Sequence, residues 1–293
     1  MTEQPASDAT VPVVLANARQ TLAEAGVADP GVDATLLLAH VLGTSRGDIQ
    51  LKESLGYSLT SDEGEAFAAV LSRRAAREPL QHITGTAPFR YMELLVGPGV
   101  FVPRPETEIV AQYAIDALWA VANPAPVAVD LGTGSGAIAL AMATEVPHSR
   151  VIAVERSVDA HAWAAKNVAH VGATNMELRN GDFASALDDL AGTVAVIASN
   201  PPYVPAEAIP RDLEVRLYDP KEALYSGADG LDDIRVISGV GLRLGYPGSS
   251  IVLEHGEWQG ADIREILTAD GWMSAATHQD LTMRDRVTTA VHP

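Results

Sequence analysis

Four short apolar runs, each followed by a helix-like segment, constrain the fold of this chain more than any other feature of its sequence. The runs are residues 127–131, 151–155, 194–198 and 251–254, and all are rich in Val, Ile, Leu and Ala. Strands that read as near-continuous apolar runs and alternate with helices are typical of a parallel sheet covered on both faces. The sequence therefore predicts a doubly wound, mostly parallel α/β domain, which binds ligands beyond the carboxyl ends of its strands.

The part of the chain before these strands has a different periodicity. Between about Val11 and Arg77 apolar residues recur at spacings of three and four, and Thr60 precedes a run of acids. This pattern predicts a small helical bundle over 1–82, with a helix beginning at Thr60. Residues 83–104 predict a linking β-hairpin, with strands over 89–96 and 100–102 around the turn 97–99. The α/β domain is then expected over 105–293.

Charge and cysteine content exclude several classes of function. The 293 residues include 38 acidic and 20 basic side chains, giving a formal charge of -18, and no cysteine. Such a surface repels phosphate, and the Lys/Arg cluster that stands out is Arg73, Arg74 and Arg77. Disulfides, thiolate metal sites and cysteine nucleophiles are excluded, and no metal site is expected. Because the start Met1–Pro5 lacks a basic region before an apolar core, and no run of about 18 apolar residues occurs, we expect a cytoplasmic protein without membrane contact.

A glycine-rich loop follows the first predicted strand. It runs Asp130-Leu131-Gly132-Thr133-Gly134-Ser135-Gly136-Ala137, and Glu155 ends the next strand 19 residues after Gly136. Glycines let a ligand approach the backbone closely, and a carboxylate at the second strand end can accept hydrogen bonds from ribose hydroxyls. The pair predicts a nucleoside-cofactor site. The spacing of the glycines also satisfies the dinucleotide fingerprint, so a nicotinamide cofactor remains an alternative here.

A rigid polar turn follows the third predicted strand, with the sequence Asn200-Pro201-Pro202-Tyr203. Prolines cannot donate hydrogen bonds and have a fixed φ, so the carbonyls of this turn lack a local donor. Asn200 adds a side-chain carbonyl, and Tyr203 adds an aromatic face. A planar NH2 group has two protons, and Asn200 with the backbone of Pro201 can accept both.

Taken together, these motifs carry a family resemblance. The Gly132–Gly136 loop, Glu155, Gly181-Asp182-Phe183 and Asn200–Tyr203, in this order, resemble class I S-adenosylmethionine-dependent methyltransferases that act on planar nitrogens. Three further runs resemble the HemK/PrmC family, the N5-glutamine methyltransferases of peptide chain release factors. These runs are Pro79–Gly85, Phe101–Glu108 and Leu253–Gly256.

The resemblance implies a role for each motif residue. Gly132, Thr133, Gly134, Ser135 and Gly136 would cradle the methionine and ribose portions of S-adenosylmethionine, Glu155 would hold the ribose, and Asp182 with Phe183 would flank the adenine. Asn200 would border the cofactor and, with Pro201, Pro202 and Tyr203, would hold the substrate glutamine. We expect Asn200 and Pro201 to accept the amide protons while Tyr203 packs against the amide plane. The products would be the methylated glutamine and S-adenosylhomocysteine.

The implied partner is a release factor, docked through the helical domain of a monomeric enzyme that does not bind nucleic acid directly. An enzyme that methylates exocyclic amino groups of adenine or guanine in nucleic acid is the main alternative, because those groups need the same acceptors. A nicotinamide-dependent oxidoreductase and a non-catalytic nucleotide sensor are weaker alternatives.

Some single residues were open to more than one interpretation. Glu254 and His255 end the fourth run and are interpreted as a structural polar pair or a contact to the cofactor. Arg104 is interpreted as a partner-binding residue or as paired with Glu106 or Glu108. Trp163, Trp258 and Trp272 are predicted to lie in the core.

Overall fold

The computed structural model describes residues 10–293, which divide into two units. The helical unit contains the described residues up to Gly85 together with Arg211–Tyr218, and the sheet unit contains Thr86–Pro210 and Asp219–Pro293. The prediction of a chain without a targeting segment depends on Met1–Pro5, which lie outside the described residues. Within residues 10–293, no helix combines the length and apolar character that a membrane crossing requires.

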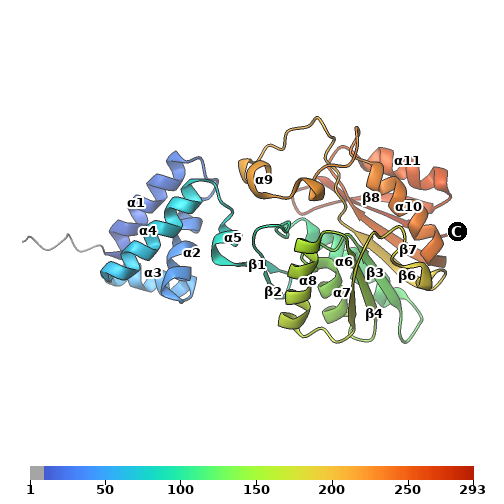
Figure 1. Cartoon of the computed structure of the whole chain (residues 1–293), viewed down its shortest axis with the longest axis horizontal. Helices are drawn as coiled ribbons and strands as arrows, with labels where there is room; N and C mark the ends of the chain where they lie inside the picture. Colours follow the sequence, from blue (N-terminus) through green and yellow to red (C-terminus); the bar gives the residue numbers. More distant parts are fainter. Residues whose placement is uncertain (1–9) are drawn as a thin grey trace, which may run out of the picture. The chain divides into compact units, whose positions relative to one another are not determined.

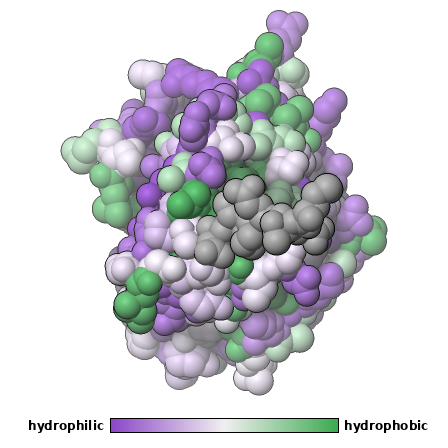
Figure 2. Space-filling view, turned by 90° about the vertical axis from the view of Figure 1, so that its left-hand side faces the viewer, coloured by the Kyte–Doolittle hydropathy of each residue, from purple (hydrophilic) through white to green (hydrophobic). Residues whose placement is uncertain are grey.

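Short amphipathic helices form the helical unit (Figure 1). They are α1 (Val11–Glu24), α2 (Pro30–Leu42), α3 (Arg46–Leu55), α4 (Ser61–Ala75), α5 (Leu80–Thr84) and α9 (Leu213–Tyr218). Their core includes the buried side chains of Leu15, Leu22, Leu37, Ile49 and Phe67. On the part of this unit that is visible in Figure 2, hydrophobic residues form small separate patches among hydrophilic ones.

The sheet unit contains a seven-stranded sheet in the order β5-β4-β3-β6-β7-β9-β8. The strands are β3 (Val127–Leu131), β4 (Arg150–Glu155), β5 (Met176–Asn180), β6 (Val194–Ser199), β7 (Gly245–Glu254), β8 (Met273–Gln279) and β9 (Asp285–Val291). The first five are parallel, and β9 is antiparallel to both β7 and β8. The predicted mostly parallel α/β fold is confirmed.

Helices cover both faces of this sheet. The helices are α6 (Thr107–Ala120), α7 (Ala137–Glu145), α8 (Val158–Val171), α10 (Asp232–Leu244) and α11 (Gly260–Asp270), with 3-10 turns η1 (Asp188–Leu190) and η2 (Lys221–Ala223). Alternate strand residues point to opposite sides, so Ala128 packs in the layer of α6 and α7, whereas Val129 packs in the layer of α10 and α11. This two-sided burial explains why the central runs 127–131, 151–155, 194–198 and 251–254 are almost entirely apolar.

The hairpin is present, but the predicted turn was wrong. Its strands are β1 (Thr86–Phe89) and β2 (Met92–Leu95), so the chain reverses at Arg90 and Tyr91 rather than at Gly97–Gly99. Arg90 has a positive φ of 52° and is fixed there by Glu108, which accepts from its backbone amide at 3.0 Å, and by an ion pair with Glu145. Gly97 instead provides close approach, because a Cβ there would lie 2.5 Å from the Trp163 ring. The contacts of Arg90 with Glu108 and Glu145 therefore determined where the hairpin turns, although Gly97–Gly99 has the more turn-like composition.

The strand order reverses between β3 and β6, which places two motifs side by side. Chain order runs outward from β3 through β4 to β5 and then returns to β6 on the other side of β3. Asp130 pairs with Ala198, and the Ser199 hydroxyl donates to the Leu131 carbonyl at 2.6 Å. The glycine loop and the Asn-Pro-Pro-Tyr turn therefore leave neighbouring strands at the same edge, where ligands of such sheets bind.

Candidate active site

The glycine loop is an open cradle of fixed shape. Gly132 and Gly134 have φ of 74° and 58°, and a Cβ built on either would meet nothing within 4 Å. The loop amides are already used, since Gly132 and Thr133 both donate to the Val154 carbonyl and Gly134 donates to Glu155. The loop therefore offers space for a ligand, and its own hydrogen bonds keep that space preformed.

Asp130 is a buried carboxyl group beneath this loop. Its Oδ2 accepts from the Thr133 hydroxyl at 2.5 Å and from the Ala139 amide at 3.1 Å, whereas Oδ1 has no partner among the described residues. Burial raises the pKa of Asp130 to about 7, and the nearby Glu155 adds to the rise. An unpartnered carboxyl oxygen at a ligand cradle is ready to accept a hydrogen bond. In the sequence Asp130 stands directly before the glycine loop, and the motif by itself predicts no role for its side chain.

Glu155 lies at the end of β4, as predicted. Its two oxygens accept from the backbone amides of Gly134 and Ser157, each at 2.8 Å, and the residue is buried. In the structure Glu155 therefore braces the glycine loop, and each oxygen keeps a second lone pair.

Asp182 and Phe183 follow β5, next to the end of β4. Glu155 pairs with Asn180, and the Gly181 amide donates to the Glu155 carbonyl at 3.0 Å. Asp182 is exposed and accepts from the Ala184 amide, while Phe183 is half-buried against the core. The structure thus brings the predicted residues of three successive strand ends to one edge of the sheet.

The Asn-Pro-Pro-Tyr turn follows β6 with Pro201 buried and its neighbours half-buried. The Asn200 side-chain amide donates to the Thr107 hydroxyl at 3.3 Å, at the start of α6. This bond orients the side chain, so that Oδ1 is left as an acceptor. No group of residues 10–293 donates a hydrogen bond to Asn200 Oδ1 or to the Pro201 carbonyl.

Tyr203 is held from three sides. Its carbonyl accepts from the Gln259 side chain at 3.0 Å, and its hydroxyl donates weakly to Glu254 at 3.5 Å. Gly230 leaves room for the backbone, since a Cβ there would lie 2.3 Å from the Tyr203 carbonyl oxygen. Burial raises the pKa of Tyr203 above its usual value, so the hydroxyl stays protonated at neutral pH.

Glu254 ends β7 behind this turn and is only 1% exposed. Burial raises its pKa to about 7, against the opposing effects of the Thr107 hydroxyl and the Arg286 charge. Its Oε2 has no partner among the described residues. Glu254 thus contacts the turn from within the sheet, whereas His255 is buried between the Thr288 hydroxyl and the Gly256 carbonyl, each at 2.8 Å.

Arg104 has a different partner from those expected. It pairs with Asp219 at 2.8 Å and lies over the Phe101 ring, rather than pairing with Glu106 or Glu108. Asp219 lies 115 residues away in the sequence, so no local spacing could have indicated the pair. Thr107, Gly230 and Gln259, which support the turn, were likewise not singled out, because their partners come from other elements.

Models of known protein families match both parts of the chain. The PrmC N-terminal domain matches residues 14–85, and the methyltransferase small domain matches residues 95–225, which include the glycine loop and the Asn-Pro-Pro-Tyr turn. A protein of Streptomyces coelicolor named release factor glutamine methyltransferase is 49% identical over 94% of this chain and 96% of its own length. The chain belongs to the release factor glutamine methyltransferase family.

Two further members of the family show the same extent of similarity. The Bifidobacterium longum protein of that name is 44% identical over 95% of this chain and 98% of its own length. The Mycolicibacterium smegmatis protein is 43% identical over 93% of this chain and 94% of its own length. The similarity to the release factor glutamine methyltransferases therefore extends through both units of the structure, and the resemblance stated from the motifs is confirmed.

Proposed function

We propose that this protein transfers a methyl group from S-adenosylmethionine to the side-chain amide nitrogen, N5, of the glutamine in the Gly-Gly-Gln motif of peptide chain release factors. The observation that carries the proposal is the pair of oxygen acceptors, Asn200 Oδ1 and the Pro201 carbonyl. Neither receives a hydrogen bond from residues 10–293, and they stand beside the glycine cradle at one sheet edge. Family membership supports the same reaction.

The residues at the glycine loop fit S-adenosylmethionine. The space over Gly132 and Gly134 would admit it, Asp130 Oδ1 and Glu155 would accept from its amino and hydroxyl groups, and Asp182 with Phe183 would flank its adenine. When bound, this cofactor supplies a methyl group activated by its sulfonium. Thr133, Ser135 and Gly136 complete the cradle.

The Asn-Pro-Pro-Tyr turn would hold the nucleophile. An amide nitrogen is a poor nucleophile because its lone pair is delocalised into the carbonyl. Asn200 and Pro201 would accept hydrogen bonds from its two N–H groups, which fixes the direction of the NH2 group, while Pro202 stiffens the turn and Tyr203 packs against the amide plane. One of these protons leaves the nitrogen for water after the methyl group is transferred. Such fixed positioning of reactants is worth up to roughly 7 to 11 kcal/mol of barrier.

The basic cluster that could have favoured nucleic acid is engaged elsewhere. Arg73 pairs with Glu78, and Arg74 and Arg77 pair with Asp33 and Glu214. With a formal charge of -18, this supports a protein substrate over methylation of exocyclic amino groups in nucleic acid. We further propose that the helical unit docks the release factor, and that the enzyme acts as a cytoplasmic monomer that makes no contact with membranes.

Mass spectrometry of the substrate tests this function. The enzyme is incubated with a purified release factor and S-adenosylmethionine, and the Gly-Gly-Gln peptide is expected to gain the mass of one methyl group on glutamine. A release factor whose motif glutamine is replaced should gain none. Methyl incorporation into DNA or RNA, with none into the release factor, would support the nucleic-acid alternative instead.

Asn200→Ala tests the acceptor pair. Because the variant removes one of the two acceptors, we expect turnover to fall at least about 100-fold. Binding of S-adenosylmethionine, measured by calorimetry, should be largely kept. The matched control is Asn123→Ala, an exposed asparagine in the loop before β3 and away from the carboxyl ends of the strands, which should leave turnover unchanged. Near-normal methylation by Asn200→Ala would contradict the assignment.

A further inference from the structure

The segment that follows the Asn-Pro-Pro-Tyr turn does not stay with the sheet unit. Residues 211–218, which include α9, belong by their contacts to the helical unit, although the chain before and after them belongs to the sheet unit. The chain therefore passes between the two units after residues 85, 210 and 218. Only seven residues, 204–210, separate Tyr203 from this inserted segment.

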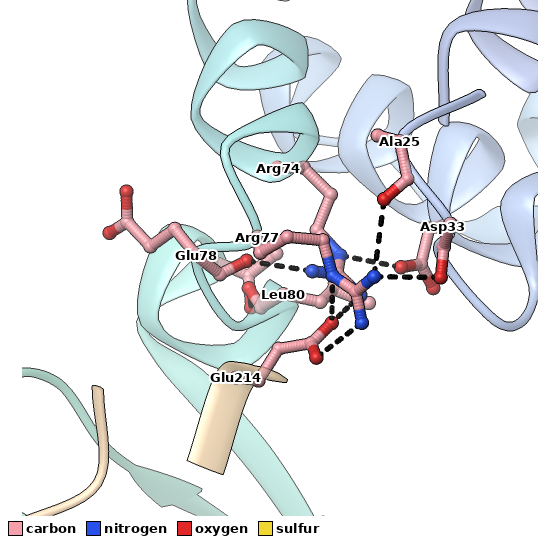
Figure 3. Close-up of polar contacts among 9 residues, drawn as sticks. Ala25, Asp33, Arg74, Arg77, Glu78, Leu80 and Glu214 are labelled. Carbon is pink, nitrogen blue, oxygen red and sulfur yellow. Dashed lines mark hydrogen bonds and ion pairs between the residues drawn. The ribbon is translucent and has the colours of Figure 1, made fainter. Parts of the chain in front are cut away.

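Glu214 of α9 is held by two arginines of the helical unit (Figure 3). Arg77 donates to both of its oxygens, from Nε to Oε1 at 2.9 Å and from Nη2 to Oε2 at 2.5 Å, and Arg74 adds a bond to Oε1 at 2.9 Å. A bidentate guanidinium–carboxylate pair of this kind is the strongest and most directional form of ion pair. We call Arg74, Arg77 and Glu214 the clasp.

The two arginines are also held by residues other than Glu214. Arg74 is 7% exposed and donates to Asp33 at 2.7 Å, and Arg77 donates to the carbonyls of Ala25 and Gly26. Burial alone would raise the pKa of Glu214, but the hydrogen bonds from Arg77 and Arg74 outweigh it and hold this pKa at about 2. The carboxylate therefore stays charged throughout the neutral range.

Outside the clasp, the described residues give α9 one hydrogen bond to the rest of the helical unit. The helix has six residues, none of them buried, and Leu217 is 59% exposed. The Tyr218 hydroxyl adds one bond of 3.4 Å to the Ala76 carbonyl. A helix this short is not stable by itself, and the clasp supplies most of its hydrogen bonds to the helical unit.

The chain on both sides of residues 211–218 is fixed in the sheet unit, near the Asn-Pro-Pro-Tyr turn. Val204 bridges Tyr225, with the Val204 amide donating to the Leu224 carbonyl at 2.8 Å, and Asp219 pairs with Arg104 at 2.8 Å. Pro205 and Pro210 restrict the backbone between Val204 and the clasp. A change at Glu214 can thus reach Tyr203 through a short, stiff stretch of chain.

We propose that Arg74, Arg77 and Glu214 are positioning residues that set the segment after the Asn-Pro-Pro-Tyr turn for a whole protein substrate. This proposal rests on the proposed function, and it explains why the enzyme would prefer a whole release factor to a short peptide. The helical unit would dock the release factor, and the clasp would hold the segment that leads from this unit to the turn. A short peptide carrying Gly-Gly-Gln uses the turn alone and does not depend on the clasp.

The variant Glu214→Gln tests the proposal, with Glu207→Gln as the matched control. Glu207 is an exposed glutamate of the same segment and has no ion pair within the described chain. For a full-length release factor we expect Glu214→Gln to raise KM about tenfold, with a smaller change in kcat. For a short Gly-Gly-Gln peptide kcat/KM should stay unchanged, as should the calorimetric Kd of S-adenosylmethionine. Glu214→Asp keeps the charge, so its KM for the release factor should return most of the way to the wild-type value.

Two results would overturn the proposal. One is a Glu214→Gln enzyme with the same KM for the release factor as Glu207→Gln. The other is an equal loss for protein and peptide, which would mean general damage to the fold. Amide hydrogen exchange over residues 204–218 gives a readout that needs no activity, and exchange should be faster in Glu214→Gln only. If the wild-type enzyme methylates neither substrate, the proposed function fails, while the exchange result still decides whether the clasp holds the segment.

Discussion

Single residues at the strand ends combine burial with unused hydrogen-bonding capacity. Asp130 and Glu254 are each 1% exposed, and each has a carboxyl oxygen without a partner in the described chain. Unpaired polar atoms in a core are costly, so each of these two oxygens is a candidate to accept a hydrogen bond from a ligand at this edge of the sheet. Burial raises the pKa of both carboxyl groups to about 7.

Glu254 makes stability depend on pH. Its pKa is about 7 in the folded protein against 4.5 for the ordinary group, so between these values the folded state binds more protons than the unfolded one. The free energy of unfolding therefore falls as pH rises through this window, by at most about 1.4 kcal/mol per pH unit from this group. In Glu254→Gln this loss is absent, so the variant should gain stability relative to wild type as pH rises from about 4.5 to about 7.

Urea unfolding of both proteins at several pH values measures this effect. Asp130 titrates in the same direction but is present in both proteins, so the difference between them isolates Glu254. A difference in unfolding free energy that stays constant over the whole range would show that Glu254 is ionised in the fold already at low pH.

Two glycines with the same φ allow the effect of backbone strain to be distinguished from the effect of filling the space for the cofactor. Gly134 and Gly43 both have φ of 58°, and a Cβ on either would meet nothing within 4 Å. Alanine should therefore destabilise both sites equally, by about 1 kcal/mol. At Gly134 the added methyl group also enters the cradle, so Gly134→Ala alone should weaken binding of S-adenosylmethionine. Thermal unfolding and calorimetry on the two variants check this. Equal affinity of the two variants for S-adenosylmethionine would show that the glycine loop is not part of the binding site.

Much of the site could be predicted at the residue scale, because both motifs directly follow strands. Glycine spacing and paired prolines have local causes, which a single sequence displays. The tryptophans show where this reasoning stops. Trp272 is buried as predicted and Trp163 is half-buried, but the prediction for Trp258 was wrong, since it is 82% exposed. Trp258 lies in the turn between β7 and α11, where apolar periodicity has no meaning.

Among the elements, those whose ends are marked in the sequence were predicted best. The helix expected to begin at Thr60 is α4, and its capping box is present, with Thr60 accepting from the Glu63 amide and Glu63 accepting from the Thr60 amide. The hairpin turn and α9 were not predicted, because Arg90 and Glu214 find their partners 55 and 137 residues away. Such pairs appear only once the chain is folded.

The capping box gives a prediction for α4. Thr60→Ala leaves the first-turn amide of Glu63 without its partner, so we expect a loss of about 1 kcal/mol in the unfolding free energy. Thr21→Ala is the control, because Thr21 is an equally exposed threonine inside α1 and alanine favours the helix interior. Chemical denaturation should show a lower midpoint for Thr60→Ala only. Equal midpoints for the two variants would show that the box does not stabilise α4.

At the scale of the whole molecule, sequence alone indicated a helical part and an α/β part, but not how the chain is shared between the two units. The apolar strands required a sheet covered on both faces, and the strand order then brought the glycine loop and the Asn-Pro-Pro-Tyr turn to one edge. The return of residues 211–218 to the helical unit has no clear sequence signal, since the segment is short and half of its residues are charged.

That return limits how the protein can be dissected. Removing residues 1–85 would delete Arg74 and Arg77 and leave Glu214 as a lone acidic group on a helix with no buried side chain. A truncated methyltransferase half made in this way would carry a loose loop directly after the Asn-Pro-Pro-Tyr turn. Residues 204–218 would then be the first place for a protease to cut, and weak activity of such a fragment would reflect the lost attachment as much as the loss of the docking that we propose for the helical unit.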